Sequence, residues 1–420
     1  MTAVIERQSV ETQAKKAKQA SYVMQTASEE EKNHALLILA DELEKNMAFL
    51  LKENEKDLDN GRAKGYDEAY MDRLKLDEER IKGFSEGLRQ VSELEDPSGV
   101  TLEKWILDNG LEAEKVSVPL GVIGMIYEAR PNVTADAAGL AIKSGNAIVL
   151  KGGSSAIHSN AAIARILREG LTHTKLPEEA VQFISSTDRE AARELFTMKE
   201  HIDVLIPRGG GALIQAVVEN ATVPVLETGV GNCHLYIDEN ADADKALPIL
   251  INAKTDRPAV CNAAETLLIH EKWLKKYKDV LNAAFNAHGI QVHGDETAVQ
   301  HMDGAKKAEE KDWTDEYLSL DIAMKVVSGL DEAIGHINEY GTKHSEAIIT
   351  EDEQTAEEFL NRVDAAAVYH NASTRFTDGS ALGFGAEIGI STQKLHARGP
   401  MGLPALTTVK IKLRGNGQIR

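Results

Sequence analysis

Short apolar segments alternate with longer helical patterns from about residue 115 onward, and this alternation limits the fold more than any other feature of the chain. The segments expected to be strands are 116–118, 122–126, 147–150, 181–184, 204–206 and 223–226. The helices expected among them are 134–143, 158–170, 186–198 and 212–220. Alternation at this spacing predicts a parallel sheet with helices on both faces.

A second set of strands and helices begins near residue 235 and continues to about residue 369. It opens with an expected strand at 235–238, a helix at 244–254, a strand at 265–269 and a helix at 271–288. Residues 6–94 instead repeat apolar side chains at three- and four-residue steps, which predicts helices throughout. Because 420 residues exceed one ordinary core, we expect an α/β fold with two doubly wound parallel-sheet domains.

The charge and the cysteine count exclude several classes of protein. A net charge of -20 argues against nucleic acid as a partner, since phosphate backbones require clustered Lys and Arg. No apolar run approaches the roughly 20 residues of a membrane helix, and the first seven residues lack the pattern of a secretory signal. Two cysteines cannot form a disulfide framework, so we expect a cytoplasmic protein. His288 and His293 form the only close histidine pair, and nothing near them completes a zinc site, so no metal is expected.

Two glycine-rich turns follow expected strands. The first is Lys151-Gly152-Gly153-Ser154, and the second contains Gly209 and Gly210. Neither matches the dinucleotide pattern G-x-G-x-x-G. Each turn can direct backbone N–H groups and a helix N-terminus at a phosphate, or can simply be a tight turn without a ligand. Lys151 at the end of its strand favours the anionic ligand.

Cys261 lies in a loop between an expected helix and an expected strand, where functional residues concentrate. Arg257, four residues earlier, is placed to favour a thiolate or to meet an anionic substrate. A nucleophilic cysteine and a buried structural thiol both remain open on these residues alone. Cys233 is the first residue of an apolar strand. His234 points to the opposite face of an extended chain, so the two residues are not expected to form a Cys–His pair, and Cys233 is expected to pack in the core.

Two further polar residues have alternative roles. Glu227 follows the expected strand 223–226 and is either a general base or an ordinary loop residue. Asn132 precedes an expected helix and either donates its amide to an oxyanion or caps that helix. At the other end of the chain, Val409, Ile411 and Leu413 alternate with charged residues, which predicts a strand with one apolar face. That strand can complete the sheet of a partner or pack on its own domain.

Taken together, these motifs resemble the aldehyde dehydrogenase superfamily, and within it the branch that reduces an acyl phosphate. The segments that carry the resemblance are 121–134, 149–154, 207–211, 227–234, 257–265 and 384–392, and their order and spacing make it specific. The resemblance implies a cofactor-binding domain at 1–234, to which about 371–395 return, and a catalytic domain at 235–370. It also implies oligomerisation strands at about 105–125 and 396–420, and a homo-oligomer.

The resemblance assigns roles to individual residues. It makes Cys261 the nucleophile and Asn132 the side chain that holds the oxygen of the thioester together with a backbone N–H. Lys151 falls on a lysine near the adenosine ribose, and Glu316 aligns with a glutamate that holds the nicotinamide ribose. Many members of the superfamily carry a glutamate at the position of Ser154, which would repel a 2′-phosphate. The serine therefore indicates NADPH in preference to NADH.

The activity implied is NADPH-dependent reduction of L-glutamate 5-phosphate to L-glutamate 5-semialdehyde and phosphate, the second step of proline biosynthesis. Because this substrate is anionic, Arg130, Arg257, Arg375 and Arg398 are candidates to bind it, and surface or inter-subunit ion pairs are the alternative for each. Glutamate 5-kinase, which makes the labile substrate, is a possible partner. Two rival hypotheses are a dehydrogenase that hydrolyses its thioester with Glu227 as base, and a catalytically silent homologue.

Overall fold

A computed structural model describes residues 9–420 and divides the chain into two compact units. Unit 1 consists of the chain up to Glu227 together with Phe384–Gly389 and Met401–Arg420. Unit 2 consists of Thr228–Gly383 and Ile390–Pro400. The first unit therefore ends at Glu227 and takes in two segments from the C-terminal part of the chain.

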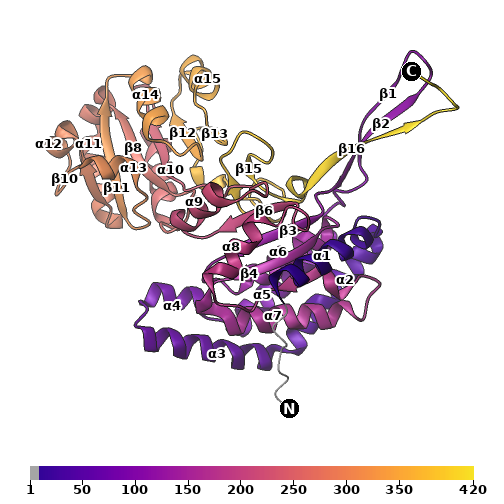
Figure 1. Cartoon of the computed structure of the whole chain (residues 1–420). Helices are drawn as coiled ribbons and strands as arrows, with labels where there is room; N and C mark the ends of the chain where they lie inside the picture. Colours follow the sequence, from indigo (N-terminus) through magenta and orange to yellow (C-terminus); the bar gives the residue numbers. More distant parts are fainter. Residues whose placement is uncertain (1–8) are drawn as a thin grey trace. The chain divides into compact units, whose positions relative to one another are not determined.

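Five helices form the N-terminal part of unit 1, as the apolar periodicity predicts (Figure 1). They are α1 (Val10–Met24), α2 (Glu29–Lys45), α3 (Met47–Lys64), α4 (Glu68–Leu74) and α5 (Glu78–Glu93). Helix α2 begins with a capping box in which Ser28 and Glu31 each satisfy a backbone N–H of the other. Residues 6–8 of the predicted helical stretch lie outside the described residues.

Unit 1 contains a four-stranded parallel sheet with the order β5-β4-β3-β6. The strands are β3 (Val122–Tyr127), β4 (Ala147–Gly152), β5 (Val181–Phe183) and β6 (Val204–Arg208). The helices of this part are α6 (Asn132–Lys143), α7 (Ile157–Leu171), α8 (Arg189–Thr197) and α9 (Gly211–Asn220). The carboxyl ends of β3, β4 and β6 lead into the segments that carry Asn132, Ser154 and Gly209, so the candidate residues of unit 1 follow one edge of the sheet.

The predicted strand at 223–226 was wrong. Only Val225 pairs with the sheet, in an isolated bridge to Leu205. Pro224 in the middle of this segment has no N–H to donate. The bridge consists of two hydrogen bonds, from the N–H of Leu205 to the carbonyl of Pro224 and from the N–H of Leu226 to the carbonyl of Leu205. A proline in the segment therefore ends the pairing after a single rung.

Unit 2 contains a seven-stranded parallel sheet with the order β10-β9-β11-β8-β7-β12-β13. Its strands are β7 (Cys233–Ile237), β8 (Ala264–His270), β9 (Gln291–Gly294), β10 (Lys306–Lys307), β11 (Asp321–Val327), β12 (Ser345–Ile349) and β13 (Ala367–His370). Its helices are α10 (Ala243–Thr255), α11 (Glu271–His288), α12 (Glu296–His301), α13 (Glu310–Thr314), α14 (Leu330–Tyr340) and α15 (Glu353–Arg362). Two parallel sheets wound by helices confirm the expected fold class.

Apolar clusters fill both faces of this second sheet. One contains Trp273, Leu281 and Phe285 of α11, and the other contains Ile334 of α14 and Phe359 of α15. The strands between them are buried along nearly their whole length, as expected for a parallel sheet that is covered on both sides. None of the helices among residues 9–420 is both long and apolar enough to span a membrane.

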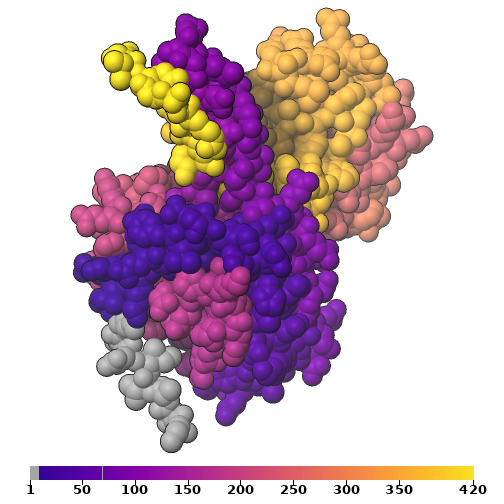
Figure 2. All heavy atoms as spheres, turned by 90° about the vertical axis from the view of Figure 1, so that its right-hand side faces the viewer, coloured from indigo at the N-terminus to yellow at the C-terminus, as the bar shows by residue number. Residues whose placement is uncertain are grey.

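A separate antiparallel sheet of unit 1 is formed by β1 (Thr101–Ile106), β2 (Glu112–Pro119) and β16 (Thr407–Arg414). The C-terminal strand, which the sequence left between two possibilities, pairs with β2 of its own chain. In Figure 2 the C-terminal residues, in yellow, lie against residues of an earlier segment, in purple. The apolar residues Val409, Ile411 and Leu413 of β16 are 49%, 57% and 59% exposed, so the described part of the chain leaves their apolar face uncovered.

Candidate active site

The loop that carries Cys261 is held by the backbone of a second segment. Cys261 lies between the end of α10 and the start of β8 and is partly exposed. Gly231 packs directly against it, so that a Cβ at position 231 would lie 1.5 Å from the carbonyl oxygen of Cys261. Only glycine permits this approach. The segment that precedes Cys233 therefore determines where the cysteine loop lies.

Cys233 is a buried thiol behind the same loop, as the sequence predicts. Its Sγ donates to the carbonyl oxygen of Cys261 at 3.2 Å and lies 3.6 Å from Nδ1 of His344. Burial raises the pKa of the Cys233 thiol well above its ordinary value. A neutral, fully buried thiol supports the cysteine loop and is not suited to nucleophilic attack.

Arg375 lies at the cysteine loop, where it binds protein groups. Its guanidinium donates to the side-chain oxygen of Asn262, and its Nε donates to Asp256 Oδ2 at 3.0 Å. The hydroxyl of Thr374 donates to the backbone oxygen of Asn262 at 2.7 Å. These contacts join the segment around residue 375 to both sides of Cys261.

The other two candidate arginines of unit 2 differ from Arg375 in their surroundings. Arg398 forms an ion pair with Asp364 at 2.7 Å, and Lys394 and Lys343 lie near the same carboxylate. Arg257 is exposed and forms no ion pair within residues 9–420. Among these three arginines, Arg257 is thus the one whose charge is not already balanced by a carboxylate.

Glu316 comes close to the cysteine loop through Gly231. Its carboxylate accepts the N–H of Gly231 at 2.8 Å, and burial raises its pKa. Gly231 therefore touches Cys261 on one side and Glu316 on the other. The structure brings together two candidate residues that are 55 positions apart in the sequence.

Asn132 is the first residue of α6 and does not cap it. The cap position is Pro131, which has no side-chain hydrogen bond. The Asn132 amide instead donates to Asp136 Oδ2 at 2.8 Å, one turn further along the helix. The protein withdraws the Asp136 carboxyl from water and raises its pKa to about 6. Asn132 is exposed and its amide is oriented by this carboxylate; Arg130 beside it is exposed as well.

Lys151 and Ser154 occupy the first glycine turn. Lys151 is 6% exposed, and its ammonium donates to the carbonyl of Gly152 at 3.0 Å. Burial lowers its pKa, and within the part of the chain that the structure describes it forms no ion pair with a carboxylate. A buried ammonium that forms no ion pair with a carboxylate of the described residues fits an anionic group of a ligand. Ser154, at the exposed start of the following turn, carries no charge itself.

The second glycine turn already holds an anion. The N–H of Gly210, which caps α9, donates to Glu128 Oε2 at 3.0 Å. A Cβ at Gly209 would meet the same carboxylate and Leu213 at 2.5 and 2.9 Å. A helix N-terminus that binds a carboxylate in this way also fits a phosphate group.

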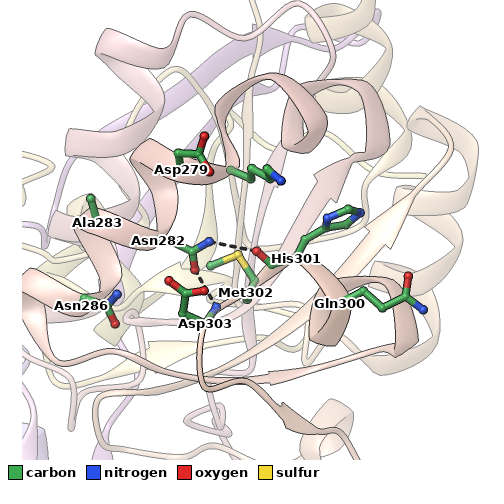
Figure 3. A pocket seen from close by; sticks show the side chains of 9 residues that line it. Asp279, Asn282, Ala283, Asn286, Gln300, His301, Met302 and Asp303 are labelled. Carbon is green, nitrogen blue, oxygen red and sulfur yellow. Dashed lines mark hydrogen bonds between the residues drawn. The ribbon is translucent and has the colours of Figure 1, made fainter.

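One hollow of the surface contains none of these residues. It has a volume of about 510 Å³, lies beside α11 and α12, and is lined by polar side chains such as Asp279, Gln300 and His301 (Figure 3). Asn282 in its wall donates to the carbonyl of His301 and accepts the N–H of Asp303, which are structural bonds between these elements. Among residues 9–420, no group of three His, Cys, Asp or Glu residues is arranged to hold a metal ion.

Sequence reasoning missed two charged residues at the ends of the cysteine loop. Lys254 in the last turn of α10 and Glu265 in β8 form an ion pair of 2.7 Å and are 0% and 1% exposed. Glu265 and Thr266 precede the apolar run Leu267-Leu268-Ile269 of a strand that is buried on both faces. A charge in such a strand requires a buried partner, and this was the signal available in the sequence.

Comparisons with known proteins identify the family of the chain. The model of the aldehyde dehydrogenase family matches residues 2–311. The chain therefore belongs to the aldehyde dehydrogenase family and is an oxidoreductase.

Among the relatives, gamma-glutamyl phosphate reductase 2 of Bacillus licheniformis is 68% identical over 98% of this chain and 97% of its own length. The gamma-glutamyl phosphate reductase of Bacillus cereus strain AH820 is 55% identical over 97% of this chain and 98% of its own. The crystal structure of gamma-glutamyl phosphate reductase from Thermotoga maritima has a TM-score of 0.96 at 48% identity, covering 98% of this chain and all of that one. Within the family, the chain belongs with the gamma-glutamyl phosphate reductases.

Proposed function

We propose that this chain reduces L-glutamate 5-phosphate to L-glutamate 5-semialdehyde and inorganic phosphate with NADPH, as the second step of proline biosynthesis. The observation that carries the proposal is the 68% identity, over nearly the whole chain, to a protein named gamma-glutamyl phosphate reductase. The partly exposed Cys261, set in a loop fixed by Gly231, supports it.

In this reaction, the Cys261 thiolate attacks the acyl phosphate carbon and forms a C–S bond. The amide of Asn132 and a backbone N–H stabilise the oxyanion, and the C–O bond to phosphate then breaks to leave a thioester. NADPH, when bound, supplies the hydride that reduces this thioester. The resulting thiohemiacetal releases the aldehyde when the C–S bond breaks, and the thiolate of Cys261 is restored. Since no water attacks the thioester, Glu227 is not required as a base.

Five residues are proposed to hold the nicotinamide cofactor. Lys151 and Ser154 would lie at the adenosine ribose and its 2′-phosphate, Gly209 and Gly210 at the pyrophosphate, and Glu316 at the nicotinamide ribose. The buried ammonium of Lys151, without a carboxylate partner among the described residues, supports the preference for NADPH over NADH. The anion already bound by Gly210 supports a phosphate at that turn.

Four arginines are proposed to recognise the anionic substrate, and their surroundings suggest two kinds of contribution. Arg130 and Arg257 are exposed in the segments next to Asn132 and Cys261. Arg375 and Arg398 are paired with Asp256 and Asp364, so substrate binding would require them to share or exchange these partners. We therefore expect substitution of Arg257 to change the KM for the acyl phosphate more than substitution of Arg398.

A homo-oligomer is proposed from the sheet of β1, β2 and β16. Its third strand exposes an apolar face that none of residues 9–420 covers, and a second copy of the chain would bury it. Association with glutamate 5-kinase would protect the labile acyl phosphate during transfer. A reducing cytoplasm, expected from the sequence, keeps a cysteine nucleophile in its thiol form.

The test is the reverse reaction, in which L-glutamate 5-semialdehyde and NADP⁺ are followed at the NADPH absorbance with and without inorganic phosphate. Strict dependence on phosphate is the expected result, because phosphate must then be the acceptor of the acyl group. Activity without phosphate would indicate hydrolysis and would restore Glu227 as the base. Binding of NADPH without activity under either condition would indicate a different substrate or a silent homologue.

A further inference from the structure

The loop of Cys261 is closed at its base by the buried ion pair that the proposed mechanism does not use. Lys254 lies in the last turn of the helix before the loop, and Glu265 lies in the strand after it. Their 2.7 Å contact is almost fully withdrawn from solvent. A buried ion pair is seldom more stable than a pair of apolar residues of the same volume. Its presence at this position therefore suggests a role in placing other groups.

Glu265 also fixes a second loop. Its two carboxylate oxygens accept the backbone N–H groups of Tyr317 and Leu318, each at 3.3 Å. Leu318 has a φ of 54°, in the left-handed region that a leucine rarely adopts. Lys254 further lies 5.9 Å from the centre of the Tyr317 ring. One buried carboxylate thus anchors two successive peptide groups of a strained turn.

Glu316 immediately precedes these two anchored residues. Its own carboxylate reaches Gly231, whose backbone lies against Cys261. Asn232 strengthens the same connection, because its amide donates to the carbonyl of Trp313 at 2.6 Å. Both sides of the Glu316 turn are therefore tied to segments that adjoin the cysteine. All of these groups belong to unit 2.

We propose that Glu265, held by Lys254, is a positioning residue that fixes the carboxylate of Glu316 beside the Cys261 loop and thereby sets the affinity for the nicotinamide cofactor. This inference rests on the proposed function, because it uses the ribose-binding role of Glu316. Burial raises the pKa of Glu265 to about 7, and the neighbouring ammonium of Lys254 opposes that rise. Lys254 thus favours the ionised form, which is the stronger acceptor for the two N–H groups.

The decisive comparison uses two double variants that are neutral and similar in volume. Lys254→Met/Glu265→Gln keeps a side-chain oxygen for Tyr317 and Leu318, whereas Lys254→Met/Glu265→Leu offers none. We expect the dissociation constant for NADPH to be about tenfold higher in the leucine variant than in the glutamine variant. A change of this size corresponds to the loss of about one hydrogen bond between uncharged groups. The kcat at saturating NADPH should change less than this constant. Equal NADPH affinity in the two double variants would overturn the proposal.

A second experiment separates positioning from a general loss of structure. If Glu265 acts through Glu316, the Glu265→Gln substitution should weaken NADPH binding in the wild-type background and have little further effect in a Glu316→Gln background. Independent, additive effects would contradict the proposal, and this test remains available if the leucine variant does not fold. Lys245→Met removes the exposed ion pair to Glu351 at the other end of the same helix and serves as the control, with no change expected.

Different results would contradict the proposed function and the positioning role of Glu265. If the wild-type protein neither binds NADPH nor shows the phosphate-dependent reaction, the proposed function is wrong. If the wild-type protein does both and the variants of Glu265 bind NADPH as tightly as it does, only the positioning role is wrong.

Discussion

Gly231 lies so close to Cys261 that a Cβ on the glycine would sit 2.8 Å from the Cα and 1.5 Å from the carbonyl oxygen of the cysteine. The contact joins two backbones, so neither side chain can rotate to relieve a clash. Gly231 also donates its N–H to Glu316. One glycine thus determines the distance between the proposed nucleophile and a proposed cofactor ligand.

Replacing Gly231 by alanine should therefore lower kcat/KM by at least about a hundredfold, since displacement of a reacting group by about 1 Å has effects of that size. The matched control is Gly289→Ala, at a position of unit 2 with open space around its Cβ, where a φ of 66° predicts a modest loss of stability and no loss of activity. Thermal unfolding and steady-state kinetics of both variants are the measurements. Normal activity in the Gly231→Ala protein would show that the contact does not position the cysteine.

The two cysteines should respond differently to substitution by serine. Cys261→Ser should abolish turnover and leave NADPH binding intact, because the hydroxyl is a much weaker nucleophile at neutral pH. Cys233→Ser should keep most of the activity, since a hydroxyl can still donate to the carbonyl of Cys261. Kinetics combined with an NADPH binding titration test both statements. Loss of activity in the Cys233 variant alone would overturn the assignment of the nucleophile.

Ser154→Glu should shift the cofactor preference from NADPH toward NADH. A carboxylate beside the buried Lys151 would neutralise its ammonium and repel a 2′-phosphate. The ratio of kcat/KM for the two cofactors is the measurement, and it should fall by about tenfold or more, which corresponds to about 1.4 kcal/mol. Ser155→Ala serves as the control at the adjacent position, where the serine hydroxyl accepts a hydrogen bond from Tyr70. An unchanged ratio in the Ser154 variant would count against this explanation of selectivity.

Glu128→Gln should tighten the binding of NADPH. The Glu128 carboxylate occupies the N–H of Gly210, where the pyrophosphate is proposed to bind, and two anions cannot share one helix N-terminus without repulsion. The glutamine keeps the shape and removes the charge. Titration at two salt concentrations should show a several-fold lower dissociation constant that approaches the wild-type value at high salt. Weaker binding by this variant would mean that Glu128 helps to hold the cofactor.

Asp136→Asn should stabilise the protein at neutral pH. The pKa of Asp136 is raised from 3.8 to about 6, so the folded state binds more protons than the unfolded state between these pH values. Stability contributed by this group is therefore present below pH 4 and is lost as the pH rises to about 6. The variant should have a higher melting temperature at pH 7.5 and a flatter dependence of stability on pH between 4 and 6. Urea unfolding across this range measures both.

The sequence predicted the four strands of the first parallel sheet and the strands β7 and β8 of the second, because their signals are local. Apolar runs of strand length, helical repeats and glycine turns each depend on neighbouring residues, and the predicted ends of most strands lie within a few positions of the observed ones. The strand expected at 223–226 is absent for an equally local reason, because Pro224 has no N–H to donate to a neighbouring strand. Asn132 was ambiguous because a residue at a helix start can cap the helix or donate its amide to an oxyanion, and the structure shows that Pro131, not Asn132, occupies the cap position.

The sequence by itself therefore determined the class of fold, the position of Cys261 between a helix and a strand, and the glycine turns at strand ends. The tertiary structure decided which distant segments meet at that cysteine. The contact of Gly231 with Cys261, the bond from Gly231 to Glu316 and the anchoring of the Glu316 turn by Glu265 all join residues from separate elements. Such contacts follow from the order of strands in the sheet, in which β7 and β11 flank β8, and no local pattern in the chain specifies that order.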